Sequence, residues 1–158
     1  MRGRDLTLDR RSGQFSAVGP GWFTTVRVDD GEFASRVGPT PATPAPTNAA
    51  NNRDKLIFRR IDFQNAIQGN LDTREGEFVH FVRTIYGPVL SWDQKLDPDR
   101  RGGLGPQGIV MTCNHLKIVD MGGGQRRAFE MTAMGNTIVE GMQFLAKADR
   151  LTYVESKD

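Results

Sequence analysis

Apolar side chains recur at every second position along much of this chain, and no other feature constrains its fold as strongly. In RAFEMTAMG, for example, Phe129, Met131 and Ala133 alternate with polar residues. A period of two puts alternate side chains on opposite faces of a β-strand, whereas a helical face needs a period of about 3.6 residues. No stretch of ten or more residues follows the helical spacing. The sequence therefore predicts an all-β protein.

Turn-forming residues divide the alternating runs into strands. The chain has 18 glycines, and tight turns are indicated at RRSGQ, TREGE and GNT. The run 76–86 is apolar on both faces, which is typical of a strand that is covered on both sides. We expect the run 55–68 to be bent or bulged. The predicted strands cover residues 4–10, 13–18, 22–29, 55–68, 76–86, 88–92, 108–119, 126–134, 137–141, 142–148 and 150–155.

Two long segments interrupt the strand pattern without marking a domain boundary, because strand patterning resumes after each. Residues 38–54 are rich in Pro, Ala, Thr and Asn, which bury too little apolar area to offset the entropy of ordering. Residues 93–108 are polar and rich in Gly and Pro. We therefore expect a single domain spanning 1–158, with flexible loops at 38–54 and 93–108.

Charge and composition narrow the class of protein. The 21 basic and 19 acidic residues leave a net charge of +2, and the N-terminal arginines lie beside aspartates rather than in a dense basic patch with aromatics. This pattern argues against a nucleic-acid partner. No run approaches the roughly 20 apolar residues that a membrane-spanning helix requires, and the N-terminus lacks the apolar stretch of a signal peptide.

The chain carries no recognisable catalytic motif. Cys113 and His115 lie two residues apart in CNH, but a zinc site needs two more ligands at a suitable spacing, and the only other histidine is His80. Nucleophile-elbow, phosphate-loop and metalloprotease motifs do not occur. We therefore do not expect an enzyme, and we predict no catalytic residue, no metal and no cofactor.

A short phrase occurs near both ends of the chain and once between them. RDLTL, NHLKI and DRLTY each place two apolar residues on one strand face. Repeated strand units of this kind build stacked β-folds in which no single unit can bury its apolar face alone. The apolar pairs are Leu6 and Leu8, Leu116 and Ile118, and Leu151 and Tyr153.

The stretch AMGNTIVEGMQFLAKADRLTYVESKD, residues 133–158, resembles a known repeat. It is similar to the repeat of the OstA-like family of lipopolysaccharide-transport proteins, which includes LptA, LptC and the N-terminal domain of LptD. Residues 4–19 resemble the second half of the same unit. The positions that carry the resemblance are Gly135, Ile138, Val139, Gly141, Ala146, Ala148, Asp149, Leu151, Thr152 and Tyr153.

The resemblance implies an open, twisted antiparallel β-jelly roll whose apolar groove binds the acyl chains of lipopolysaccharide or another envelope lipid. It also implies edge-to-edge stacking on other OstA-like domains and a location in the periplasm or envelope. Because no signal peptide is present, we expect a fragment of a longer exported repeat array. The implied groove residues are Phe129, Met131, Met142, Phe144, Leu151 and Tyr153, and the implied edge-strand residues are Leu6, Leu8, Leu151 and Thr152.

A second interpretation of the same residues is a purely structural β-solenoid or sandwich module, with a closed core and no ligand. A third is a binder of anionic polymers that uses the arginines of the N-terminal strands. The first two interpretations differ in whether an apolar channel continues to both ends of the roll. Sequence does not decide this, because groove width depends on sheet twist and closure.

Overall fold

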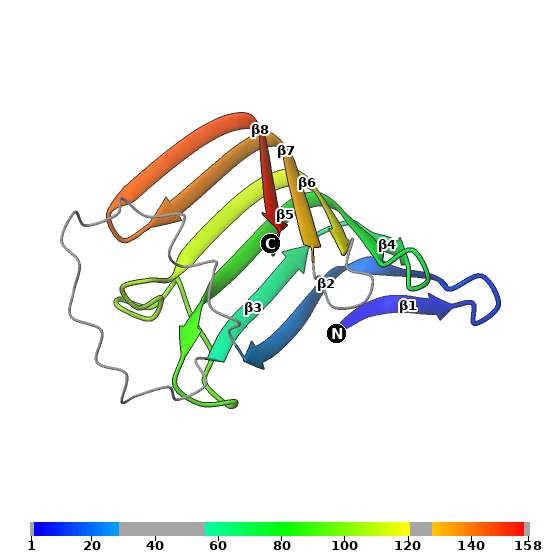
Figure 1. Cartoon of the computed structure of the whole chain (residues 1–158), viewed down its shortest axis with the longest axis horizontal. Helices are drawn as coiled ribbons and strands as arrows, with labels where there is room; N and C mark the ends of the chain where they lie inside the picture. The colour runs from blue at the N-terminus through cyan, green and yellow to red at the C-terminus, as the bar shows by residue number, and fades with distance from the viewer. Residues whose placement is uncertain (1, 29–55, 121–127, 157–158) are drawn as a thin grey trace.

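A computed structural model describes residues 2–28, 56–120 and 128–156, and within these ranges the chain forms strands and no helix (Figure 1). The all-β class predicted from the alternation is confirmed. Every strand pairing is antiparallel. The strands are β1 (Arg2–Leu8), β2 (Gln14–Val28), β3 (Leu56–Phe63), β4 (Ala66–Asn70), β5 (Glu75–Val89), β6 (Ile109–Asp120), β7 (Ala128–Gly141) and β8 (Phe144–Ser156).

The strands form one sheet in the order β1-β2-β3-β5-β6-β7-β8. Strand β4 follows β3 after only Gln64 and Asn65, and both strands pair with β2 on one side and β5 on the other. Strands β2, β3, β5 and β4 are therefore paired in a small closed ring. Within it, β3 and β4 act as two parts of one strand that is broken at Gln64 and Asn65. The predicted bend within 55–68 is thus confirmed.

A line of backbone irregularities crosses the sheet and divides it into two limbs. Register shifts occur in β5, β6 and β7, and left-handed φ angles occur at His80, Phe81, Gly135 and Asn136. Bulges of this kind bend and twist a strand locally. In Figure 1 the long strands turn sharply along this line. The first limb contains residues 21–28, 56–63, 82–89, 109–113, 137–141 and 144–148, and the second contains 14–18, 66–70, 75–79, 115–120, 128–134 and 150–156.

The main core lies where the inner faces of the two limbs meet. Ile61 and Met111 of the first limb belong to the same buried cluster as Phe78 and Leu116 of the second limb. Fully burying such a side chain contributes about 1.5–3 kcal/mol. The bend therefore creates the core, because it turns one face of a single sheet toward itself.

A second core covers the outer face of the first limb. Phe58, Ile85 and Val110 pack there against Leu96 and Leu104, which belong to the loop between β5 and β6. Strand β5 is therefore buried on both faces within the first limb, which confirms the prediction for residues 82–86 but not for the rest of the run 76–86, where Phe81 is 73% exposed.

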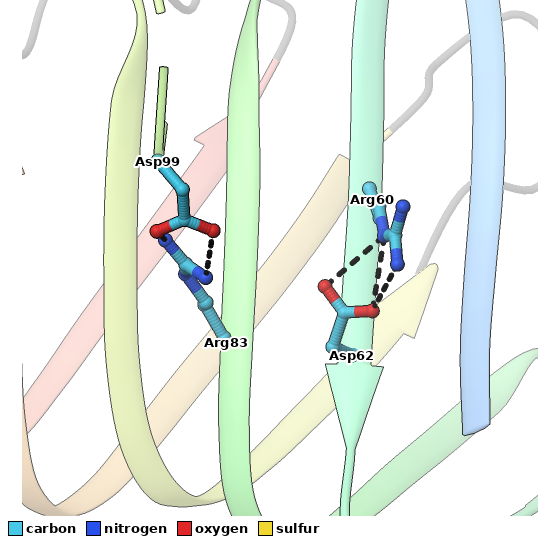
Figure 2. Close-up of polar contacts among 4 residues, drawn as sticks. All are labelled: Arg60, Asp62, Arg83 and Asp99. Atoms are coloured by element: carbon cyan, nitrogen blue, oxygen red, sulfur yellow. Dashed lines mark hydrogen bonds and ion pairs between the residues drawn. The ribbon is translucent and has the colours of Figure 1, made fainter. Parts of the chain in front are cut away.

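The loop 93–108, which the sequence predicts to be flexible, is anchored at two points. Leu96 is only 6% exposed in the second core. The guanidinium of Arg83 in β5 also donates two hydrogen bonds to the Asp99 carboxylate, at 2.8 and 3.0 Å (Figure 2). The other predicted loop, 38–54, lies outside the described residues.

We expect Leu96→Ala to lower the free energy of unfolding by about 2–5 kcal/mol, because it opens a cavity in the second core. The matched control is Leu90→Ala, also between β5 and β6, where the side chain is 95% exposed. Its effect should stay within about 0.5 kcal/mol. Urea denaturation of both variants measures the difference, and equal effects would mean that the loop is not part of the folded unit.

Candidate functional site: an apolar groove between the limbs

Two of the three repeated phrases come together on the inner face of the second limb. Leu116 and Leu151 both lie opposite Ala133, one from each side of β7. Ile118 and Tyr153 lie opposite Met131 in the same way. The phrases NHLKI and DRLTY therefore occupy equivalent places on β6 and β8, two strands apart, and present the same face.

Two cavities lie between this face and the first limb. The cavity toward β8 has a volume of about 200 Å³. The cavity toward β1 has a volume of about 510 Å³. Arg59, Ile61 and Ile118 line both, so the two cavities are neighbours on the same inner face, and together they are called the groove.

The groove reaches both edges of the described sheet. At one end it is lined by Leu151 and Tyr153 of β8, and at the other by Leu6 and Leu8 of β1. Within the described ranges, β8 pairs only with β7 and β1 only with β2. Apolar cavities thus lie beside both edge strands of the described sheet.

Small residues in the second limb make room for the larger cavity. Phe15, Gly69, Gly76 and Ile118 lie in register across four strands. The ring of Phe15 lies over Gly69, whereas a Cβ at Gly76 would meet no atom within 4 Å. The empty space beside Gly76 belongs to the groove, which Gly76 lines.

The lining is mainly apolar, with two polar groups at its centre. Arg59 is half-buried, and its guanidinium lies over the ring of Tyr86, 5.7 Å from the centroid. Thr84 is only 7% exposed, and its Oγ1 has no hydrogen-bond partner within the described part of the chain. Both residues line the smaller cavity. The acidic groups of the lining, Glu75 and Asp120, border the larger cavity only.

Three of the predicted groove residues line the groove: Met131, Leu151 and Tyr153. Two others do not. Met142 lies in the turn between β7 and β8 and is 68% exposed, and the ring of Phe144 packs against Gly141. Both residues line a separate hollow beside Leu104.

The remaining predicted residues lie on β1, β7 and β8. Phe129 lies in β7 opposite Asp120, and its side chain is outside the described part of the structure. Among the predicted edge residues, Leu6, Leu8 and Thr152 are exposed on the edge strands and Leu151 is half-buried, and all four line the groove.

The sequence did not predict the residues that form the opposite wall of the groove. This wall is formed by inner-face residues of β3, β5, β6 and β7, and part of it was detectable in the sequence. In LIFRRIDF, Arg59 shares one face with Ile57 and Ile61, so a charge interrupts an apolar row. The missed residues that line the smaller cavity are Arg59, Ile61, Thr84, Tyr86, Ile109, Met111 and Val139.

Cys113 and His115 have separate environments. Burial raises the pKa of the Cys113 thiol to about 11. The Nε2 atom of His115 lies 2.6 Å from a carboxylate oxygen of Glu77 on the outer face of the second limb. A hydrogen bond donated by Gln68, followed by the contact with His115, lowers the pKa of Glu77.

The described residues contain no group of three His, Cys, Asp or Glu side chains placed to hold a metal ion. Nor do they include a helix long and apolar enough to cross a membrane. No protein-family model, curated protein or solved structure matches this chain.

We expect Cys113 to resist alkylation in the folded protein, because burial and its raised pKa keep the thiol protonated at pH 8. Iodoacetamide labelling followed by mass spectrometry measures this directly. The control is the double variant Cys113→Ser, Ser91→Cys, which moves the thiol to an exposed loop position and should react at the rate of a free cysteine. Equal rates at the two positions would contradict the buried placement.

Proposed function

We propose that this chain binds the acyl chains of an envelope lipid in the groove between its limbs, as a lipid-transport bridge or envelope-assembly module. The proposal rests on one observation, the apolar groove that reaches both edge strands. The resemblance of residues 133–158 and 4–19 to the OstA-like repeat adds the ligand class, lipopolysaccharide or a related lipid. The same resemblance favours the periplasm or envelope as its location.

The size and polarity of the groove favour this function over a closed structural core. Protein interiors are close-packed, and most contain few voids larger than a water molecule. The two neighbouring cavities, of about 200 and 510 Å³, fall within the range of ligand sites when taken together. Each methylene buried there would contribute about 0.8 kcal/mol, so a ten-carbon chain has enough apolar surface for measurable binding.

The edge strands favour a second part of the proposal, stacking on other domains of the same type. Strands β1 and β8 carry backbone groups that no described strand pairs. Such edges add further strands readily, and head-to-tail addition need not close into a ring. Because the groove reaches both edges, stacked domains would present a continuous apolar channel to a lipid.

We expect the series Gly76→Ala, Gly76→Val and Gly76→Leu to weaken lipid binding progressively, because each side chain fills more of the larger cavity. Stability should stay level or rise, since glycine inside a strand costs roughly 0.5–1 kcal/mol relative to alanine. Displacement of the fluorescent fatty acid cis-parinaric acid measures affinity, and thermal unfolding measures stability.

The control for this series is Val154→Leu, an enlargement at an exposed position of β8. It should leave affinity unchanged. Undiminished binding by Gly76→Leu would show that the lipid does not occupy the groove, and absence of binding by the unmodified chain would favour the closed structural module.

We expect the purified chain to form oligomers whose size grows with concentration, and Thr152→Pro to reduce this association. Proline removes an N–H donor and is poorly accommodated in paired strands. Sedimentation velocity over a wide concentration range provides the measurement, and Ser91→Pro in the exposed loop is the control. Circular dichroism should report a retained β-fold in both. A single monomeric species at all concentrations would exclude edge stacking.

A further inference from the structure

We infer that strand β1 is a flap beside the larger cavity, and that an acyl chain enters the groove when this strand lifts away from β2. The inference rests on the proposed lipid-binding function and adds the route by which the lipid reaches the cavity. The flap consists of Arg2–Leu8, and its pivot is the turn that joins β1 to β2.

Strand β1 covers one side of the larger cavity without contributing to the core. Leu6 and Leu8 line this cavity, yet they remain 62% and 50% exposed. Within the described ranges, no residue of β1 belongs to either buried core cluster. Segments with few buried apolar contacts open at the lowest cost in free energy. Strand β1 can therefore separate from the sheet while the core stays folded.

The pairing of β1 with β2 is irregular. The step from Arg4 to Thr7 spans three residues of β1 but only two of β2, and Asp5 within this bulge has a left-handed φ of 52°. A bulge leaves a residue out of the hydrogen-bonded ladder. Strand β8, at the other edge of the described sheet, pairs with β7 along nearly its whole length with one register shift. Of the two edge strands, β1 is thus the more weakly held.

The two ends of β1 are held in different ways. The turn after β1 is tied to the neighbouring hairpin of β4 and β5, because the amide of Leu71 donates a hydrogen bond to the carbonyl of Gly13 at 2.9 Å. At the other end, the guanidinium of Arg4 donates a hydrogen bond to the carbonyl of Gly19 at 2.9 Å. A lifting movement that pivots at the turn breaks the Arg4 contact and keeps the Leu71 contact.

A disulfide between β1 and β2 tests the flap by holding it closed. Arg4 and Val18 lie opposite each other and are both exposed, and the Cα separation of paired residues in adjacent strands suits a disulfide. In the double variant Arg4→Cys, Val18→Cys, we expect oxidation to slow association and dissociation of cis-parinaric acid about tenfold or more. The equilibrium affinity should stay within about twofold, because the flap is closed both with and without ligand and the disulfide blocks only the path between these states.

Stopped-flow fluorescence at low protein concentration, where association through the edges is smallest, measures both rates. Dithiothreitol should restore them. The matched control is a disulfide at the opposite edge of the sheet, Glu130→Cys, Val154→Cys, between paired residues that do not line the groove. Its oxidation should leave both rates unchanged.

A second variant shifts the rates in the opposite direction. Arg4→Met removes the hydrogen bond to Gly19 and should speed association and dissociation about two- to tenfold at unchanged affinity, the factor expected for one hydrogen bond. Its control is Arg2→Met, which removes the same charge from an exposed position of the same strand and should leave the rates unchanged.

The outcomes separate the flap from the proposed function. Equal rates in the oxidised and reduced forms of Arg4→Cys, Val18→Cys would overturn the inference and leave lipid binding intact. A loss of affinity without slower association would also overturn it, because it indicates a distorted site, as would unchanged rates in Arg4→Met. If the unmodified chain does not bind cis-parinaric acid, the proposed function itself fails, and the inference fails with it.

Discussion

The turn of one continuous sheet back on itself is the constraint on which the rest of this structure depends. Backbone irregularities at Gln64 and Asn65, at His80 and Phe81, and again in β6 and β7 lie along one line across the sheet. Left-handed φ angles at a residue such as Phe81 are uncommon, so the surrounding strands must hold them in place. Without that bend the inner apolar faces would have no partner, and neither the main core nor the groove would exist.

The two walls of the groove differ in how they are supported. The first limb has a core on each face, because Leu96 and Leu104 cover its outer side. The second limb is packed on its inner face, and its outer face carries polar pairs such as His115 with Glu77. Local stability follows the density of buried apolar contacts, so we expect the second limb to open more easily than the first. A groove with one firm wall and one adjustable wall suits ligands of variable shape.

The groove contains empty space beside Gly76 and a charged side chain, that of Arg59. Gly76 leaves space where any other residue would fill part of it, and Arg59 and Thr84 place polar groups among apolar ones. Voids forfeit packing energy and unsatisfied hydroxyls cost stability, so contacts elsewhere in the fold must offset both.

The sequence by itself determined the all-β class, because a period of two assigns side chains to faces wherever a strand is regular. It also placed Leu116 with Ile118, and Leu151 with Tyr153, each pair on one strand face. Only the tertiary structure decided which residues of the first limb lie across the groove from them. Met111 and Leu116 both line the smaller cavity although they are five residues apart, an odd separation that a regular strand would place on opposite faces. The register shift in β6 between them resets the alternation, and because it is held in place by neighbouring strands, local sequence does not reveal it.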